Sequence, residues 1–488
     1  MTLTAKRLTK SRFQSGRQCH KRLWLEIHHP ELVRPSDAVQ SRLAEGTRFG
    51  EFVREWFGGV LVDAAPYERD KALAQTRIYL DAPPTRVPML YEAAFEHEGV
   101  FVRIDALMRY PLADRLIEVK SATQPKDEYF WDCAIQTWVM RGAGRPVQHI
   151  GLCLVDSSFV YTREGDYKGL LNLDNYTEQV EALLPQVPGI VTELKAVVAG
   201  EQPVIATGPQ CEAPYPCPFF EHCRAGEPPA PAYPVEALRA RKSVRNLREA
   251  GYSDLREVPD ELLEKPKHKR IATAAKSGDA VTSPEFDAVL AAIPYPRHYL
   301  DFETIYFVVP RWIGTRPYQQ IPFQFSCHIE QQDGAMEHRE HLDLSGASPV
   351  EAFADALLAA VGDAGPILVW NQSFEATRVC ELAKMLPGRA EMLLALIDRM
   401  VDLLPIYREH YYHRDMHGSW SIKAVLPTVA PELTYSNLEV GDGGAAQAAY
   451  LEAVDSAATA ERREELRAQL LAYCERDTLA MVRLAKPL

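Results

Sequence analysis

The chain has 488 residues, of which 47% are hydrophobic and 25% are charged, and this balance predicts a globular protein of two or three domains rather than a disordered one. The net charge of −13 argues against a protein that coats nucleic-acid phosphates with a uniformly basic surface. The N-terminus lacks the apolar core of a signal peptide, and we see no apolar run long enough to cross a bilayer, so we expect a cytoplasmic protein with no membrane partner.

Basic residues are concentrated at the N-terminus, where residues 1–25 contain no acidic side chain. This stretch could form a local basic strip beside an active site despite the acidic total. Its seven basic residues are Lys6, Arg7, Lys10, Arg12, Arg17, Lys21 and Arg22.

The first candidate site lies in two predicted strands, residues 101–107 (FVRIDAL) and 116–121 (LIEVKS). Asp105 is placed at the end of the first strand, and Glu118 and Lys120 share one face of the second because side chains alternate along a strand. Two carboxylates can hold a hard divalent cation, while a lysine can orient or activate water for attack on phosphate. The alternative interpretation is an exposed polar strand edge.

Neighbouring segments extend this pattern to helix, three strands, helix and strand. Residues 90–96, with Glu92, read as a preceding strand; residues 130–140, with Gln136, read as an amphipathic helix; and residues 149–155 read as a buried strand. This part of the chain resembles the PD-(D/E)XK nuclease superfamily, in particular its RecB-like branch.

The resemblance implies catalytic and metal-binding roles for particular residues. Two features depart from the family pattern: Met140 stands where a tyrosine is common, and residues 45–50 lack a histidine often found in the first helix. The implied catalytic residues are Asp105, Glu118, Lys120 and Gln136, with Asp105 and Glu118 as ligands of Mg²⁺ or Mn²⁺ and Glu92 as a further candidate ligand.

Four of the nine cysteines bracket the predicted nuclease, namely Cys19, Cys211, Cys217 and Cys223. Four thiolates suit an iron–sulfur cluster or a tetrahedral zinc ion, and unligated thiols are the third possibility. Members of the RecB-like branch with one cysteine before the core and three after it hold a [4Fe-4S] cluster, and the resemblance implies the same here. Such a cluster would close a very long loop and stabilise the fold by roughly 4–5 kcal/mol. We expect the other five to be buried in the core: Cys133, Cys153, Cys327, Cys380 and Cys474.

A proline-rich stretch at about 225–234 marks a predicted domain boundary. Residues 235–275 then read as short helices with several basic residues. This segment resembles a helix-hairpin-helix element, and an ordinary helical linker is the alternative. We therefore predict a nuclease domain at 1–225, a linker with a small helical segment at 226–289, and a second domain at 290–488.

The second candidate site is spread over three segments of that C-terminal domain. Asp301 and Glu303 lie two residues apart in the predicted strand 297–305, so they share a face. Glu375 follows the buried strand at 366–370, at the start of a helix, and Tyr473 and Asp477 have the i, i+4 spacing of one helix face.

These three motifs resemble the DEDD-type 3′–5′ exonucleases of the RNase H-like fold, in the subclass that carries a tyrosine. The resemblance implies that Asp301, Glu303, Glu375 and Asp477 hold two divalent cations and that Tyr473 orients the attacking water. The family normally has aspartate where Glu375 stands. A weakened metal site that only binds a strand is therefore the alternative.

Taken together, the sequence predicts an α/β protein with a PD-(D/E)XK restriction-endonuclease-like domain followed by an RNase H-like domain. The whole chain resembles a bacterial two-domain family of unknown function, on the strength of residues 11–26, 316–326 and 418–427. We expect a metal-dependent nuclease acting on single-stranded or end-exposed nucleic acid, DNA more than RNA. The alternative is a nucleic-acid binding or scaffolding protein with an inactive C-terminal domain. A helicase or other repair or defence protein is an expected partner, because the chain lacks the phosphate-binding loop of a motor.

Overall fold

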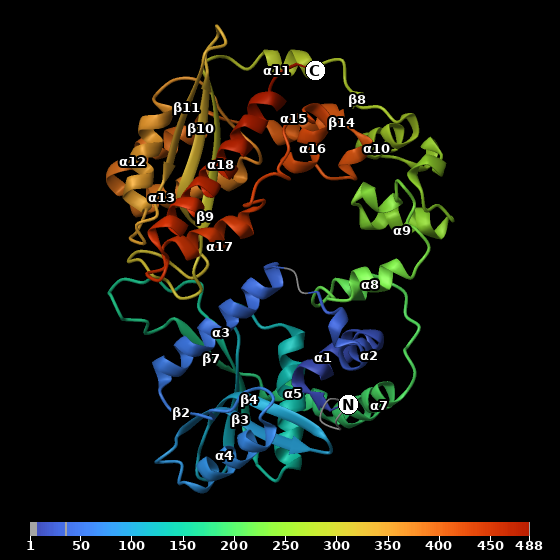
Figure 1. Cartoon of the computed structure of the whole chain (residues 1–488), viewed down its shortest axis with the longest axis vertical. Helices are drawn as coiled ribbons and strands as arrows, with labels where there is room; N and C mark the ends of the chain where they lie inside the picture. The colour runs from blue at the N-terminus through green and yellow to red at the C-terminus, as the bar shows by residue number, and fades with distance from the viewer. Residues whose placement is uncertain (1–6, 35–36, 488) are drawn as a thin grey trace. The chain divides into compact units, whose positions relative to one another are not determined.

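The computed structural model describes residues 7–34 and 37–487 (Figure 1). The chain divides into two compact units, and the prediction of a mixed α/β protein is confirmed. The first unit runs to Pro229 and also includes Phe307–Tyr318. The second unit contains Ala230–Tyr306 and the chain from Gln319 onward.

The first unit is built on a seven-stranded sheet in the order β2-β3-β4-β5-β6-β7, with β1 paired to β4. Strands β3, β4 and β5 are antiparallel neighbours, whereas β5 and β6 are parallel. The strands are β1 Leu8–Thr9, β2 Val60–Leu61, β3 Met89–His97, β4 Val100–Met108, β5 Asp114–Val119, β6 Val147–Val155 and β7 Leu171–Asn175.

Helix α5, Asp127–Gly142, makes the crossover between the parallel strands β5 and β6 and packs across β3 to β6. Such a connection is required because parallel neighbours cannot be joined by a tight turn. Its buried residues share a core cluster with strand residues such as Ile104 and Leu116. The remaining helices of this unit are α1 Lys10–Gln18, α2 His20–His28, α3 Asp37–Phe57, α4 Arg69–Asp81, α6 Thr177–Leu183, α7 Val187–Ala199 and α8 Phe220–Ala225.

One helical stretch of the described residues, Thr177–Ala199, is long and apolar enough by composition to cross a membrane, which the sequence interpretation did not anticipate. In the structure Val187, Val191 and Leu194 of this stretch are buried in the core cluster of the first unit. Part of its apolar surface therefore packs against protein, with 22% of the apolar window buried.

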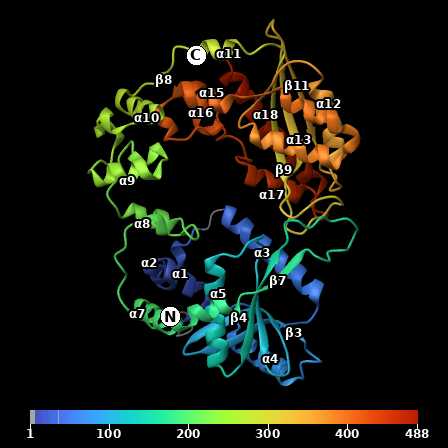
Figure 2. The ribbon, with the colours of Figure 1, turned by 180° about the vertical axis from the view of Figure 1, so that it is seen from behind.

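The second unit contains a five-stranded sheet in the order β11-β10-β9-β12-β13. Figure 2 shows two of its strands, β9 and β11, with α12 and α13 of the same unit. The first three strands are antiparallel, and β9, β12 and β13 are parallel. Helix α18, Ala460–Leu484, packs along β9 and β10. The strands are β9 Arg297–Ile305, β10 Ile321–Glu330, β11 Met336–Leu342, β12 Ile367–Val369 and β13 Met400–Asp402.

Residues 226–289 were expected to form a linker and a small helical segment, and from Ala230 onward they belong to the second unit and contribute to its core. Val235, Leu255 and Ile271 are buried in the same cluster as Tyr299 and Tyr407. The other elements of the unit are α9 Arg241–Glu249, α10 Pro266–Ser277, β8 Val281–Thr282, α11 Phe286–Ala291, α12 Val350–Val361, α13 Ser373–Met385, α14 Ala390–Asp398, α15 Leu403–His410, β14 Tyr411–Tyr412, α16 Ile422–Val429 and α17 Gly443–Ala453.

Candidate functional site

The first site is assembled on the adjacent strands β4 and β5. Asp105 lies within β4 rather than at its end, and its Oδ2 accepts a hydrogen bond of 3.0 Å from the backbone N–H of Val119. Glu118, in β5, is fully buried. Helix α5 brings Gln136 to the same point, where its Nε2 donates to Glu118 Oε2 at 2.6 Å. Two strands and the crossover helix thus converge on one pair of carboxylates.

Lys120 follows β5 and bridges two carboxylates. Its Nζ lies 2.8 Å from Glu118 Oε1 and 2.9 Å from Asp132 Oδ2. Asp132 is one helical turn before Gln136 on α5, and it also accepts a 3.0 Å hydrogen bond from Gln14. Lys120 is therefore held beside the pair by contacts on both sides.

Lys10, the first residue of α1, also reaches this site. Its Nζ lies 3.0 Å from Asp105 Oδ1, 2.9 Å from Glu118 Oε1 and 3.1 Å from Glu118 Oε2. Sequence reasoning placed Lys10 in a basic N-terminal strip but did not connect it to Asp105, 95 residues away. Asp132 was also missed, although its i, i+4 relation to Gln136 was a usable signal.

The two carboxylates of this pair have opposite pKa shifts. Burial, reinforced by the charge of Glu118, raises the pKa of Asp105 to about 6. Burial also disfavours charge on Glu118, but Lys10, Lys120 and the hydrogen bonds lower its pKa to about 2. Glu118 is therefore the permanent anion of the site.

Glu92 and Met140, singled out in the sequence, have different surroundings in the structure. Glu92 lies in β3 with a φ of 58°, between Tyr91 and Ala93, which pair with Ala106 and Ile104 of β4, and its carboxylate lies 3.0 Å from Arg103 Nε. Met140 is fully buried in the core of the unit. Glu92 thus has an ion-pair partner in Arg103 and stays a candidate ligand, and Met140 packs in the core.

The donor set of the first site fits a divalent cation. Asp105 and Glu118 supply carboxylate oxygens, the ligands that Mg²⁺ and Mn²⁺ prefer. The Oε1 atom of Gln136 is buried and has no hydrogen-bond partner among the described residues. A buried acceptor without a partner beside two carboxylates suits a hydrated cation, whose water molecules can donate to it.

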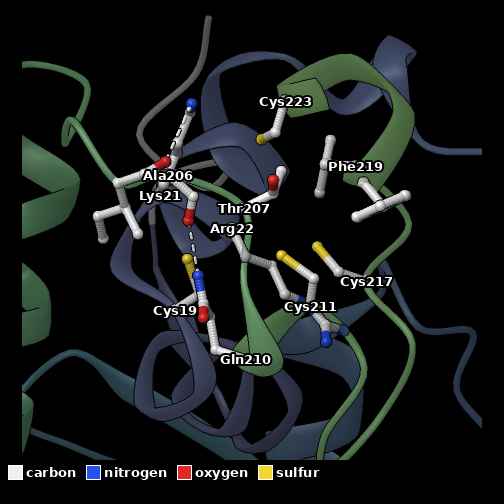
Figure 3. Close-up of a pocket in the computed structure, with 12 residues that line it drawn as sticks. Cys19, Lys21, Arg22, Ala206, Thr207, Gln210, Cys211, Cys217, Phe219 and Cys223 are labelled. Atoms are coloured by element: carbon white, nitrogen blue, oxygen red, sulfur yellow. Dashed lines mark hydrogen bonds between the residues drawn. The ribbon is translucent and has the colours of Figure 1, made fainter. Parts of the chain in front are cut away.

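The four bracketing cysteines line one small cavity in the first unit (Figure 3). Cys19 lies between α1 and α2, Cys211 ends a short 3-10 turn, and Cys223 belongs to α8. The backbone N–H of Cys217 donates to the carbonyl of Cys211 at 2.8 Å, and Figure 3 shows all four sulfurs turned toward the same space.

The four thiols of this cavity have the donor chemistry of an iron–sulfur cluster or a tetrahedral zinc ion. All four of its cysteines are half-buried free thiols, and they come from segments about 200 residues apart in the chain. Gln18 ties these segments together, because its Nε2 donates to the carbonyls of Gln210 and Tyr215. Of the other five cysteines, Cys133, Cys153, Cys327 and Cys474 are buried, whereas Cys380 is half-buried.

The second site brings together carboxylates from β9 and α18. Asp301 and Glu303 in β9 and Asp477 in α18 each offer an oxygen within 4.8 Å of the others. Tyr473 lies one turn before Asp477 on α18, and both side chains are buried. These residues were predicted from widely separated motifs, and the sheet and the last helix bring them to one place.

Lys423 and Tyr435 complete the surroundings of this cluster and were not predicted. Lys423 Nζ, from α16, donates to the Tyr473 hydroxyl at 3.1 Å. The Tyr435 hydroxyl donates to Asp477 Oδ1 at 2.5 Å. Lys423 thus supplies a positive charge, and Tyr435 fixes one carboxylate.

Glu375 approaches from the first turn of α13 but is not part of the three-carboxylate group. Its side chain is 2% exposed, and its Oε2 has no hydrogen-bond partner within the described chain. Asp402 fixes the start of α13 by accepting backbone hydrogen bonds from Asn371 and Gln372, each at 3.0 Å. Glu375 is therefore a buried carboxylate with an available oxygen, as a cation site requires.

Burial is the largest cause that raises the pKa of the three clustered carboxyls and of Glu375. The pKa of Asp301 lies well above its ordinary value because of burial and of the charges on Asp477, Glu303 and Glu375. Burial first, and then neighbouring charge, raises the pKa of Glu303 and of Glu375 to about 8. The pKa of Asp477 rises to about 6 through burial, against the opposing effect of Tyr435. A divalent cation bound among these carboxyls would offset the cost of their burial as anions.

Comparison with known proteins connects this region to a family without an assigned function. The family model described as a domain of unknown function (DUF2779) matches residues 298–421, which include Asp301, Glu303 and Glu375. The "Uncharacterized protein MG366 homolog" of Mycoplasma pneumoniae (strain ATCC 29342 / M129 / Subtype 1) is 27% identical over 232 residues, 42% of this chain. The match spans about a third of that relative's length (34%). The chain is thus similar to uncharacterised proteins.

Proposed function

We propose that the protein is a metal-dependent nuclease with two separate phosphodiesterase centres. The observation that carries this proposal is the group of Asp301, Glu303 and Asp477, whose carboxylates converge within 4.8 Å inside the protein. Buried acids are costly unless protonated, paired or bound to metal. Mg²⁺ or Mn²⁺ held there would supply Lewis-acid stabilisation and an activated water.

The second centre is proposed to act as a 3′–5′ exonuclease of DEDD type on an RNase H-like fold. The strand order β11-β10-β9-β12-β13, with three antiparallel strands followed by two parallel ones, supports this fold. Asp301, Glu303, Asp477 and Glu375 would hold the cations, Glu375 through its unpartnered oxygen. The Tyr473 hydroxyl, oriented by Lys423 at 3.1 Å, would position the attacking water.

The first centre is proposed to be of PD-(D/E)XK, RecB-like type. Asp105 and Glu118 would hold Mg²⁺ or Mn²⁺, and Gln136 orients Glu118 through its 2.6 Å hydrogen bond. Lys120, held by Glu118 and Asp132, would position water or stabilise charge on the phosphate. The cysteine cavity would hold a [4Fe-4S] cluster, with Zn²⁺ as the alternative, and link the two ends of the unit.

The substrate is proposed to be single-stranded or end-exposed nucleic acid, DNA in preference to RNA, with a helicase or another repair or defence protein as partner. A second candidate function is nucleic-acid binding with an inactive C-terminal centre. One observation favours it: Glu375 lies outside the group formed by the other three carboxylates. Cleavage by the second centre therefore depends on a closer approach of Glu375 when cations bind.

A cleavage assay on the full chain tests both candidates. Anaerobically purified protein is incubated with Mg²⁺ or Mn²⁺ and end-labelled single-stranded DNA or RNA. Lys120→Ala and Asp301→Ala should each remove one set of products and leave the other. The exposed Glu391→Gln serves as a matched control that changes neither set. Binding without cleavage by wild type, with the cysteine-bound metal intact, would favour the second candidate.

A further inference from the structure

We propose that Lys10 is a resident counter-ion of the first carboxylate site, which a divalent cation must displace in order to bind Asp105 and Glu118. This inference rests on the proposed metal dependence of that site. The proposed function names the residues that hold the cation. The present inference concerns what controls whether the cation is bound.

The contacts of Lys10 use the oxygens that a cation would need. An ammonium has three N–H donors, and Lys10 Nζ lies within 3.1 Å of three oxygens, one on Asp105 and two on Glu118. A cation bound to both carboxylates must take at least one oxygen from each. The ammonium and the cation therefore compete for the same ligands.

The fold places Lys10 there through its backbone. Leu8–Thr9 forms β1, which pairs with Val100 and Phe101 of β4, the strand that carries Asp105. The Thr9 side chain caps α1 by accepting from the backbone N–H of Arg12 at 3.3 Å. Lys10 is thus the first residue of α1, and the N-terminus of this helix is held next to β4, the strand that carries Asp105.

Lys10, rather than Lys120, is the ammonium that a cation would displace. Lys120 keeps a second partner in Asp132 at 2.9 Å, whereas among the described residues the ion pairs of Lys10 are with Asp105 and Glu118. A cation and Lys10 on the same oxygens would place like charges side by side, which is unfavourable in a partly buried site. Displacement relieves that repulsion.

The displaced Lys10 ammonium could contact a substrate phosphate in the proposed reaction. The Lys10 side chain is 23% exposed and carries a flexible four-carbon stem, so it can turn to an anionic group at the mouth of the site. A phosphate of the nucleic-acid substrate is such a group. Substrate phosphate and cation should therefore bind cooperatively, because each removes Lys10 from the carboxylates.

Manganese binding to the full-length protein tests the inference without substrate or turnover. All proteins carry Asp301→Asn, which disables the second carboxylate site, and free Mn²⁺ is measured by electron paramagnetic resonance. Lys10→Met should bind Mn²⁺ more tightly, by about 5- to 150-fold, the usual range for coupled sites. Lys10→Arg keeps the charge and should remain close to the parent. Lys126→Met is the matched control, since the Lys126 ammonium lies 6.0 Å from the Tyr129 ring and makes no ion pair with the carboxylates that the structure describes.

The outcomes separate this inference from the proposed function. Equal or weaker Mn²⁺ binding by Lys10→Met, with binding intact in the parent and abolished by Glu118→Gln, would overturn the role of Lys10 alone. Absence of binding in all of these proteins would overturn the metal site itself. If Lys10→Met folds poorly, the rise in melting temperature on adding Mn²⁺ decides: a larger rise than in the parent supports displacement, and an equal rise refutes it.

Discussion

Ionisation of Glu303 should make the metal-free protein less stable as the pH rises. Burial and the charge of Asp477 raise the pKa of Glu303 to about 8 in the folded protein, against an ordinary value of 4.5. Below pH 4.5 this carboxyl is neutral in the folded and unfolded chains, so it contributes no pH dependence there. Between the two pKa values the unfolded chain has lost the proton and the folded chain keeps it. Rising pH therefore favours unfolding, by about 1.4 kcal/mol per pH unit for this one group.

Urea denaturation of the full-length protein in the presence of a chelator measures this effect, with tryptophan fluorescence as the signal. The free energy of unfolding is compared at several pH values between about 5 and 8 for wild type and Glu303→Gln. The variant should show a slope that is shallower by about 1.4 kcal/mol per pH unit. Glu391→Gln, on an exposed position of α14, should keep the wild-type slope. The reasoning is refuted if Glu303→Gln and wild type have the same pH dependence.

Three further predictions concern the cysteine cavity, a buried ion pair and the tyrosine of α18. Cys19→Ala should abolish the visible absorption of an iron–sulfur cluster and lower the melting temperature, whereas Cys153→Ala, a buried core position, should keep the absorption. Arg145→Leu leaves the fully buried Asp114 without its 2.6 Å partner, so the free energy of unfolding by urea should fall by about 3–5 kcal/mol while Mn²⁺ affinity is unchanged. Tyr473→Phe should reduce kcat for 3′-end cleavage by about 10²-fold with little change in KM, because it removes one hydroxyl from the water-positioning group.

The parts of both sites that were predictable lie in locally patterned segments. Glu118 and Lys120 follow from strand alternation, and the pair Tyr473 and Asp477 follows from helical spacing. Each motif lies on a single element, so the chain itself fixes the spacing of its members. The prediction of a mixed α/β protein is confirmed for the same reason, since both periodicities are visible in the sequence.

Residues brought in by long-range packing could not be found in this way. Lys10 reaches Asp105 only because β1 pairs with β4, and a two-residue strand carries no usable periodicity. Lys423 enters the second site from a segment 50 residues away from Tyr473. Phe307–Tyr318 packs with the first unit although the chain on both sides belongs to the second, and nothing in its composition signals this.

The segment predicted as a linker shows that proline content indicates backbone irregularity but gives no information about packing. Proline density near 225–234 indicates irregular backbone, and the division into units does fall at Pro229. The apolar residues that follow form patterns too short to indicate a domain. Val235 and Leu255 are nevertheless fully buried in the core of the second unit. Burial of such residues depends on partners such as Tyr407, far away in the sequence.

Product analysis of cleaved nucleic acid tests the central claim most directly. Wild type, Lys120→Ala and Asp301→Ala, purified anaerobically, are compared on single strands labelled at the 5′ or the 3′ end, with and without Mn²⁺. Two active centres predict metal-dependent cleavage by wild type, mononucleotide release from the 3′ end that survives Lys120→Ala, and loss of that release in Asp301→Ala. Retention of all products in both variants would contradict the claim.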